Sequence, residues 1–257
     1  MLINDLTDKV TIITGASSGI GKACANLLAS QDGKVVLVDI NQEKLDNTVT
    51  EIKKNVDNSA KIFGLKLNVC DEAAMKEMAA QTLAKFGRID CLIASAGILR
   101  IGNNLRTVID TPLSEWETIL QTNLTGTFLS NQAVLPAMIA QKQGDIVNIS
   151  SVSGRQGRAF DAAYCASKFG IIGFSESLAE EVAAYGIRVQ TILPDAVNTP
   201  LWDQNGPQSM RAALALPPER VAQLILHLIT LPRDAFMLNT VIAPFKGRKK
   251  RTKDKNT

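Results

Sequence analysis

Two side chains that can exchange a proton stand close together in the stretch AFDAAYCASKFGI. Tyr164 precedes Lys168 by four residues, and residues spaced i and i+4 on a helix lie on one face, one turn apart. A free phenol ionises near pH ~10, and an ammonium held beside it stabilises the phenolate and lowers that pKa. The pair is therefore either an idle contact on a helix surface or a proton-transfer site.

Ser151 is the next polar residue with a possible chemical use. It ends the apolar run DIVNISS, which is typical of a strand, and the helix-like run that contains Tyr164 follows after a loop. A strand end, a loop and the start of a helix can place this hydroxyl beside the phenol. A lone serine can also simply cap a strand end, so the elements that position these residues decide what they do.

Short apolar runs rich in β-branched residues alternate with longer helix-like runs along the chain. We expect strands at 10–14, 34–40, 61–69, 89–96, 145–151, 187–194 and 237–244. We expect helices at 19–30, 41–55, 71–86, 114–141, 160–186 and 219–231. Because the strands are continuously apolar, they are expected to be buried on both faces. This pattern predicts a single α/β domain with a doubly wound parallel sheet between two layers of helices.

Two local features refine this arrangement. Ser114 followed by Glu117 has the spacing of a capping box and predicts the start of the helix at 114–141. The irregular stretch 194–218 is too short for a domain, and we expect it to form a lid over a substrate site within the domain 1–245.

The segment TGASSGIG (14–21) follows the first expected strand and opens the first expected helix. Its glycines allow tight turns and close backbone approach, and a helix N-terminus attracts phosphate. The loop lies between a strand and a helix that leads to a second strand, which is the context that dinucleotide binding requires. The alternative is that a sharp turn needs these glycines for packing alone. We expect contacts to the cofactor from Gly15, Ser17, Ser18, Gly19, Ile20 and Gly21.

Asp39 ends the second expected strand, about 20 residues beyond the glycines, where an acid binds the adenosine ribose hydroxyls. A 2′-phosphate would meet a like charge there, and no Arg or Lys occupies positions 18, 40 or 41 to offset it. The sequence therefore favours NAD over NADP. Asp39 also precedes a helix-like run whose first N–H groups it can bond, and the two roles are compatible.

Taken together, TGASSGIG, NLTG, NISS and YCASK resemble the short-chain dehydrogenase/reductase family, in the family's order and over roughly residues 8 to 243. The resemblance implies a three-layer Rossmann-type fold and assigns roles. Tyr164 would be the general acid/base, and Lys168 would lower its pKa and bind the nicotinamide ribose. Ser151 would bond the substrate oxygen. Asn123 would hold a water that links Lys168 to solvent.

Further cofactor contacts are implied by the same resemblance, at Asn68, Val69, Ser95, Ala96, Gly97, Pro194, Val197 and Thr199. The backbone of Val197 would bind the carboxamide. Two positions depart from the family pattern: Ser95 stands where asparagine is usual, and Asp195 where glycine is usual. The C-terminal end lacks the family's frequent glycine-rich stretch.

The expected function is hydride transfer between a nicotinamide cofactor and a secondary alcohol or ketone. An NADPH-dependent 3-oxoacyl reductase is the alternative, and a cofactor-binding redox sensor without catalysis is a third reading. In this family, helices equivalent to those at about 113–139 and 160–185 pair between subunits, which implies a homodimer or homotetramer.

Composition excludes several other classes. The 257 residues are 46% hydrophobic and 21% charged, without an apolar run of the ~20 residues that span a bilayer and without a start that resembles a signal peptide. The four cysteines form no C-x-x-C, so we expect reduced thiols and a cytoplasmic location. The single histidine lies in an apolar helix-like run, so we expect no metal site. The net charge of +3 comes from the basic tail 246–257, which we expect to be disordered or to contact an anionic partner, so nucleic-acid binding is not indicated.

Overall fold

The computed structural model describes residues 6–102, 105–205 and 214–245. Seven strands form one sheet in the order β3-β2-β1-β4-β5-β6-β7, and every neighbouring pair is parallel. The strands are β1 (Val10–Thr14), β2 (Lys34–Asp39), β3 (Ile62–Lys66), β4 (Cys91–Ala94), β5 (Gly144–Ile149), β6 (Ile187–Pro194) and β7 (Thr240–Ile242). The chain runs outward from β1 to β3 and then returns to β4 beside β1, which confirms the doubly wound parallel sheet.

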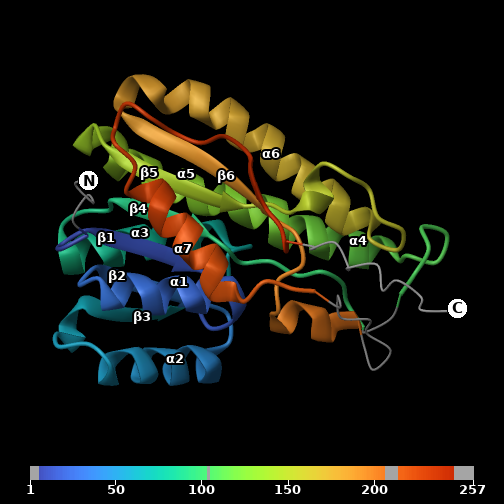
Figure 1. Ribbon diagram of the computed structural model, residues 1–257, viewed down its shortest axis with the longest axis horizontal. Coiled ribbons are helices and arrows are strands. Elements are labelled where there is room, and N and C mark those ends of the chain that lie inside the picture. Colours follow the sequence, from blue (N-terminus) through green and yellow to red (C-terminus); the bar gives the residue numbers. More distant parts are fainter. Residues whose placement is uncertain (1–5, 103–104, 206–213, 246–257) are drawn as a thin grey trace, which may run out of the picture.

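Helices cover both faces of this sheet (Figure 1). They are α1 (Gly19–Ser30), α2 (Gln42–Lys54), α3 (Glu72–Phe86), α4 (Leu113–Leu120), α5 (Gly126–Gln141), α6 (Ala162–Val182) and α7 (Pro218–Ile229). One core lies under α1, α2 and α7, and the other under α3, α5 and α6. Successive residues of one strand enter opposite cores, Ile13 the first and Ile12 the second, so both faces are buried as predicted.

Helix starts follow local side-chain chemistry in some places and backbone constraints in others. Asp71 caps α3, where its carboxylate accepts from the N–H groups of Ala73 and Ala74 at 2.8 and 3.1 Å. The predicted capping box at Ser114 is wrong. The helix α4 begins one residue earlier, because the extended Pro112 stands at the N-cap and accepts from the N–H of Glu115 at 3.0 Å.

The helix expected at 114–141 is also divided. A π-helical turn, η2 (Gln121–Thr125), separates α4 from α5. Such turns occur often at functional sites, because the extra residue redirects side chains and carbonyls. Among the described residues, no helix has both the length and the apolar character to cross a membrane.

The carboxyl ends of β1, β4, β5 and β6 lie at one edge of the sheet. The turn into α1 follows β1, and α6 begins after the loop that leaves β5. The segment after β6 contains the short helix η5 (Pro200–Asn205), which packs at this same edge (Figure 1). The motifs singled out in the sequence therefore converge where a parallel sheet of this kind binds its ligands.

Candidate active site

Ser151 lies just beyond the end of β5, next to the end of β6. Its hydroxyl donates to the carbonyl of Pro194 at 3.4 Å and accepts from the N–H of Ser153 at 3.1 Å. The same hydroxyl is within hydrogen-bond reach of Tyr164, and it favours the ionised phenol when its single proton turns from Pro194 to that side. The serine is thus both a strand-end cap and a neighbour of the phenol, as the sequence predicted.

Tyr164 and Lys168 share one face of α6, and both are buried. The ammonium Nζ lies 5.6 Å from the centre of the tyrosine ring and donates to the carbonyl of Ile149 at 2.8 Å. In addition, the Ser150 hydroxyl donates to the carbonyl of Lys168 at 2.8 Å. The idle surface contact is therefore excluded. The Ile149 carbonyl carries no side-chain signal, so sequence reasoning missed it.

Burial dominates the electrostatics of this pair. It raises the pKa of Tyr164 to about 12, against a smaller lowering by the hydrogen bond from Ser151. It also lowers the pKa of Lys168 to about 8. The expected lowering of the tyrosine pKa is therefore not found in the protein alone. Removal of each charged form from water is the largest cause of its shift, and a phenolate here needs further positive charge nearby.

Asn123 lies inside the π-helical turn η2 and is fully buried. Its side chain accepts from the N–H of Ile98 at 2.8 Å and donates to the carbonyl of the same residue at 2.8 Å and to Ser167 at 3.0 Å. The amide therefore fastens the loop after β4 to α6. The predicted water relay at Asn123 stays a prediction, because these bonds engage both amide hydrogens and the Thr127 hydroxyl already donates to its main-chain carbonyl.

The glycine loop has the shape of a phosphate cradle. Gly15 and Gly19 have φ of +66° and +50°, which L side chains rarely adopt. A Cβ on Gly15 would stand 2.8 Å from the Cα of Ala96, so the glycines also serve packing. Ser18 stands at the N-cap of α1 without a side-chain bond to the helix, which leaves the first-turn N–H groups for an anion. These features fit a dinucleotide.

Asp39 is held against the glycine loop. Its carboxylate accepts from the N–H of Ser17 at 3.1 Å and from the N–H of Asn41 at 3.0 Å. The side-chain cap of α2 is Asn41, which accepts from Lys44 at 2.9 Å, so Asp39 is not that cap. The register of the sheet also places Lys66 of β3 beside Asp39, a neighbour that the sequence analysis did not consider.

Three further predicted cofactor contacts, Ser95, Ala96 and Gly97, lie in the loop after β4. A Cβ on Gly97 would lie 3.2 Å from Oδ1 of Asn123 and 3.7 Å from Nζ of Lys168, so this glycine stands between them. The departure at Ser95 leaves the backbone in place, because its N–H and that of Ala96 donate to Thr14 at 3.2 and 3.3 Å.

Pro194, the last residue of β6, is buried. The carbonyl of Val197 accepts from the indole of Trp202 at 2.7 Å, so this acceptor is already engaged. Thr199 faces the glycine loop, 3.1 Å from where a Cβ on Gly19 would stand. The carboxylate of Asp195 lies 3.4 Å from the guanidinium of Arg158.

The adenine contacts expected from the sequence lie after β3. Asn68 accepts from the N–H of Cys70 at 3.0 Å and is exposed, whereas Val69 is buried against α5 at Gly126. Residues 206–213 of the expected lid lie outside the described residues, as does the tail 246–257.

Comparison with known proteins identifies the family. Residues 9–209 match the short chain dehydrogenase family. This chain is a member of the short-chain dehydrogenase family. It is therefore an oxidoreductase of the class that uses a nicotinamide cofactor.

Two curated relatives of this dehydrogenase are 3-oxoacyl-(acyl-carrier-protein) reductases. The enzyme of Thermotoga maritima is 38% identical over 230 residues, which cover 87% of this chain and 91% of the relative. The enzyme of Synechocystis sp. is 37% identical over 238 residues, which cover 90% of this chain and 93% of the relative.

Solved structures resemble the dehydrogenase over most of its length. Levodione reductase superposes with a TM-score of 0.84 at 30% identity, over 93% of this chain and 96% of the other. A metagenomic short-chain oxidoreductase in complex with NADP superposes with a TM-score of 0.80 at 30% identity, over 95% of this chain and 100% of the other. The Rossmann-type fold predicted from the sequence is thereby confirmed.

Proposed function

We propose that this dehydrogenase transfers a hydride between a nicotinamide cofactor and a secondary alcohol or ketone, with Tyr164 as general acid/base. The observation that supports it is the convergence of three side chains at the carboxyl edge of the sheet: Ser151, Tyr164 and Lys168. When bound, the cofactor supplies the hydride chemistry. The protein supplies binding, orientation and the proton.

Each residue has a role that follows from its contacts. The glycine loop and the start of α1 would hold the pyrophosphate, since both present backbone N–H groups. Lys168, fixed by the Ile149 carbonyl, would bind the nicotinamide ribose and add positive charge beside the phenol. Ser151 would bond the substrate oxygen, and Tyr164 would give or take the proton at that atom.

The mechanism is tested by Tyr164→Phe, with Tyr185→Phe as the matched control. Tyr185 is the only other tyrosine and is 46% exposed near the end of α6. We expect Tyr164→Phe to reduce turnover by about 10²- to 10⁴-fold, because general acid–base catalysis contributes on that scale. Cofactor binding, followed by NADH fluorescence, should change little. Unimpaired turnover in Tyr164→Phe would refute the assignment.

Cofactor choice is proposed to be NAD, because the carboxylate of Asp39 stands where a 2′-phosphate would meet a like charge. The NADP complex of the similar metagenomic enzyme supports the second candidate, NADP. In this chain Lys66 is the cation beside Asp39 that would meet such a phosphate.

The experiment compares kcat/KM with NADH and NADPH for the wild type, Asp39→Asn and Lys66→Gln. We expect the wild type to prefer NADH and Asp39→Asn to shift the ratio toward NADPH. A wild type that prefers NADPH and loses that preference in Lys66→Gln would establish the second candidate instead.

The class of substrate distinguishes an enzyme for simple alcohols and ketones from a 3-oxoacyl reductase and from a redox sensor. The two reductase relatives favour a 3-oxoacyl group on a carrier, whereas levodione reductase favours a dione without one. Reduction of cyclohexanone and of acetoacetyl-coenzyme A, measured side by side with both cofactors, distinguishes them. A protein that binds NADH but turns over no carbonyl substrate in a wide panel would be the redox sensor.

We also propose a homodimer or homotetramer that pairs through α4, α5 and α6. Three aromatic side chains are exposed there: Trp116 at 38%, Phe128 at 41% and Phe169 at 47%. Light scattering coupled to size exclusion tests this, and a monomer would refute it. A cytoplasmic location is proposed too, in keeping with four free cysteines.

The stretch 194–218 is proposed to act as the lid of this single domain. Its described part reaches across the site. The side chain of Gln204, in η5, accepts from the N–H groups of Leu99 and Arg100 at 2.7 and 3.1 Å. These bonds join the lid to the loop after β4, so lid and cofactor loop would move together.

A further inference from the structure

Arg100 is a buried arginine beside the proposed proton-transfer site. It lies three residues beyond Gly97 and is only 7% exposed. Its Nη2 donates to the carboxylate of Asp161 at 2.5 Å, and its Nη1 donates to the carbonyl of Phe160 at 3.3 Å. Its Nε has no hydrogen-bond partner among the described residues. Burying a guanidinium costs free energy of desolvation, so its ion pair and hydrogen bonds must offset that cost.

Asp161 stands at the N-cap of α6, three residues before Tyr164, but does not cap the helix. Its side chain makes no bond to the first-turn N–H groups, in contrast to Asp71 at the start of α3. An N-cap bond stabilises a helix by about 1 kcal/mol. The carboxylate of Asp161 therefore forgoes that bond and faces Arg100 instead.

The backbone before α6 is also held in an unusual conformation. Phe160 has φ of +68°, in the left-handed region that a bulky residue rarely adopts. Its carbonyl is one of the two acceptors of Arg100. The guanidinium thus holds the turn before α6 in place, and this turn determines where the helix begins. Tyr164 lies one helical turn further on.

Arg100 is itself fixed from two further sides. Asn123 clamps the backbone of Ile98, and Gln204 accepts from the N–H of Leu99 and of Arg100. The loop after β4 is therefore a rigid support, joined to the π-helical turn below it and to η5 beside it. Arg100 connects this loop to the start of α6 through its bonds to Phe160 and Asp161.

The charge of Asp161 matters to its neighbour on the helix. The carboxylate opposes ionisation of Tyr164 and adds to the burial that raises its pKa to about 12, whereas Arg158 acts in the opposite sense. Arg100 screens that carboxylate. Other charged or titratable groups around the phenol come from α6, from the loop before it and from the end of β6: Lys168, Cys165, Arg158 and Asp195, the last paired with Arg158.

We propose that Arg100 and Asp161 form a positioning pair for the reaction: the ion pair fastens the first turn of α6 to the loop that follows β4 and neutralises the Asp161 carboxylate, three residues before Tyr164. The inference rests on the proposed role of Tyr164 in proton transfer. It assigns to both residues an action through the phenol rather than a contact with substrate.

The test uses the opposite signs of the two charges. Arg100→Gln leaves the Asp161 carboxylate unscreened, so the phenol should ionise at higher pH than in the wild type. Asp161→Asn removes the negative charge and leaves the guanidinium, so the phenol should ionise at lower pH. We expect displacements of about half a pH unit or more. The double variant should return close to the wild type, because both charges are absent.

Ionisation is measured without turnover. In a Tyr185→Phe background Tyr164 is the only tyrosine, so incorporated fluorotyrosine gives one fluorine NMR signal that reports its titration in the presence of NAD. The pH profile of kcat/KM is recorded alongside, with cyclohexanone or acetoacetyl-coenzyme A as the probe. Arg100→Lys keeps the charge and should restore the titration better than Arg100→Gln.

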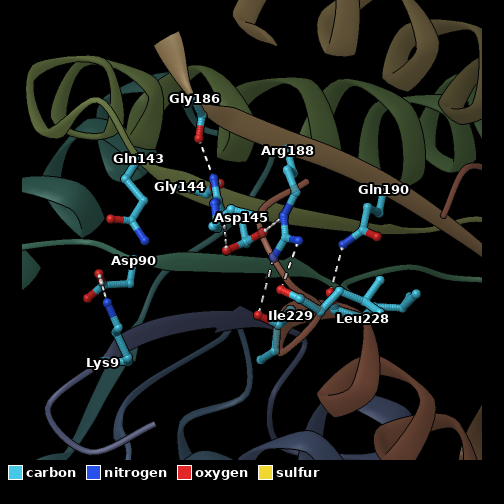
Figure 2. Close-up of polar contacts among 12 residues, drawn as sticks. Lys9, Asp90, Gln143, Gly144, Asp145, Gly186, Arg188, Gln190, Leu228 and Ile229 are labelled. Atoms are coloured by element: carbon cyan, nitrogen blue, oxygen red, sulfur yellow. Dashed lines mark hydrogen bonds and ion pairs between the residues drawn. The ribbon is translucent and has the colours of Figure 1, made fainter. Parts of the chain in front are cut away.

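A matched control lies at the opposite edge of the sheet. Arg233 donates to the Asp145 carboxylate at 2.8 Å, in the network around Asp145 and Arg188 that Figure 2 shows. Arg233→Gln should lower thermal stability and leave the titration of Tyr164 in place. If Arg100→Gln and Asp161→Asn both leave the titration unmoved, or move it in the same direction, the positioning pair is refuted. Full activity of Tyr164→Phe would instead refute the proposed function.

Discussion

Burial sets the chemistry of this site at the scale of single residues. The Tyr164 phenol and the Lys168 ammonium both lose water, and each shifts toward its neutral form. The protein thereby holds a phenol that resists ionisation beside an ammonium that loses its proton more readily. Charge that arrives with the cofactor would act on a pair that water no longer screens.

Lys168→Met is expected to stabilise the fold near neutral pH while abolishing activity. The native pKa of about 8 lies below the ordinary value of 10.5, so the unfolded chain binds more protons between these pH values. Stability therefore rises with pH across this window, and below it the full burial cost is present, about 3 kcal/mol at most. Methionine has a similar length and no charge, so it removes this cost.

Urea unfolding of wild type and Lys168→Met at several pH values checks this. The advantage of the variant should be largest below about pH 8 and should shrink as the pH rises toward 10. A variant that is less stable than the wild type by the same amount at every pH would show that the bond to the Ile149 carbonyl outweighs the burial of charge.

At the scale of elements, the π-helical turn η2 joins parts that are distant in sequence. Asn123 reaches the loop after β4 through Ile98 and reaches α6 through Ser167. A regular helix would turn this side chain to another direction, so the extra residue of the π turn is what makes the clamp possible.

Asn123→Ala should destabilise the protein by about 2–3 kcal/mol, because it removes the partner of the Ile98 N–H and carbonyl and one of the two hydrogen bonds of the buried Ser167 hydroxyl. It should also weaken cofactor binding, since the loop from Ser95 to Gly97 loses its anchor. Gln141→Ala serves as the control, because its side-chain amide clamps the N–H and the carbonyl of Ile89 in the same way, before the start of β4 and away from the site. Equal cofactor affinity in both variants would contradict this role.

The β1–α1 turn gives a second prediction at this scale. Gly15→Ala puts a Cβ 2.8 Å from the Cα of Ala96 and forces a left-handed φ of +66° on alanine. The turn must shift, so we expect cofactor affinity to fall by about tenfold or more, on the order of 1.4 kcal/mol. Gly157→Ala is the control, because no heavy atom lies within 4 Å of its added Cβ. NADH fluorescence titration of both variants measures the difference.

For the molecule as a whole, the two edges of the sheet have separate tasks. The carboxyl edge gathers the active site, and the amino edge carries a buried ion-pair network that ties β5 and β6 to the end of α7 (Figure 2). Arg188 bonds the Asp145 carboxylate at 2.7 Å and donates to four backbone carbonyls, those of Ile229, Leu231, Pro232 and Ala235.

Arg188→Met should therefore destabilise the protein by about 3–5 kcal/mol, the usual cost of breaking a buried pair. Activity per folded molecule should stay the same, because the site lies at the other edge. Chemical unfolding together with activity, normalised to cofactor-binding sites, checks both expectations. A change in kcat at full occupancy would show that the two edges are coupled.

The sequence by itself determined the parallel α/β fold, the glycine loop and the grouping of Ser151, Tyr164 and Lys168. These follow from local signals: continuous apolar strands, glycines at a βα turn, and a four-residue spacing on one helix. Asp39 was located in the same way. Such features depend on neighbours in the chain, and the fold does not override them.

Only the tertiary structure decided the rest. The ion pair of Arg100 with Asp161, the carbonyl of Ile149 under Lys168 and the place of Lys66 beside Asp39 join residues that are far apart in the chain or atoms of the main chain. Neither kind of contact has a signature in residue types and spacing. The pKa of Tyr164 belongs here as well, because the burial that raises it exists only once the helices and the sheet have packed around it.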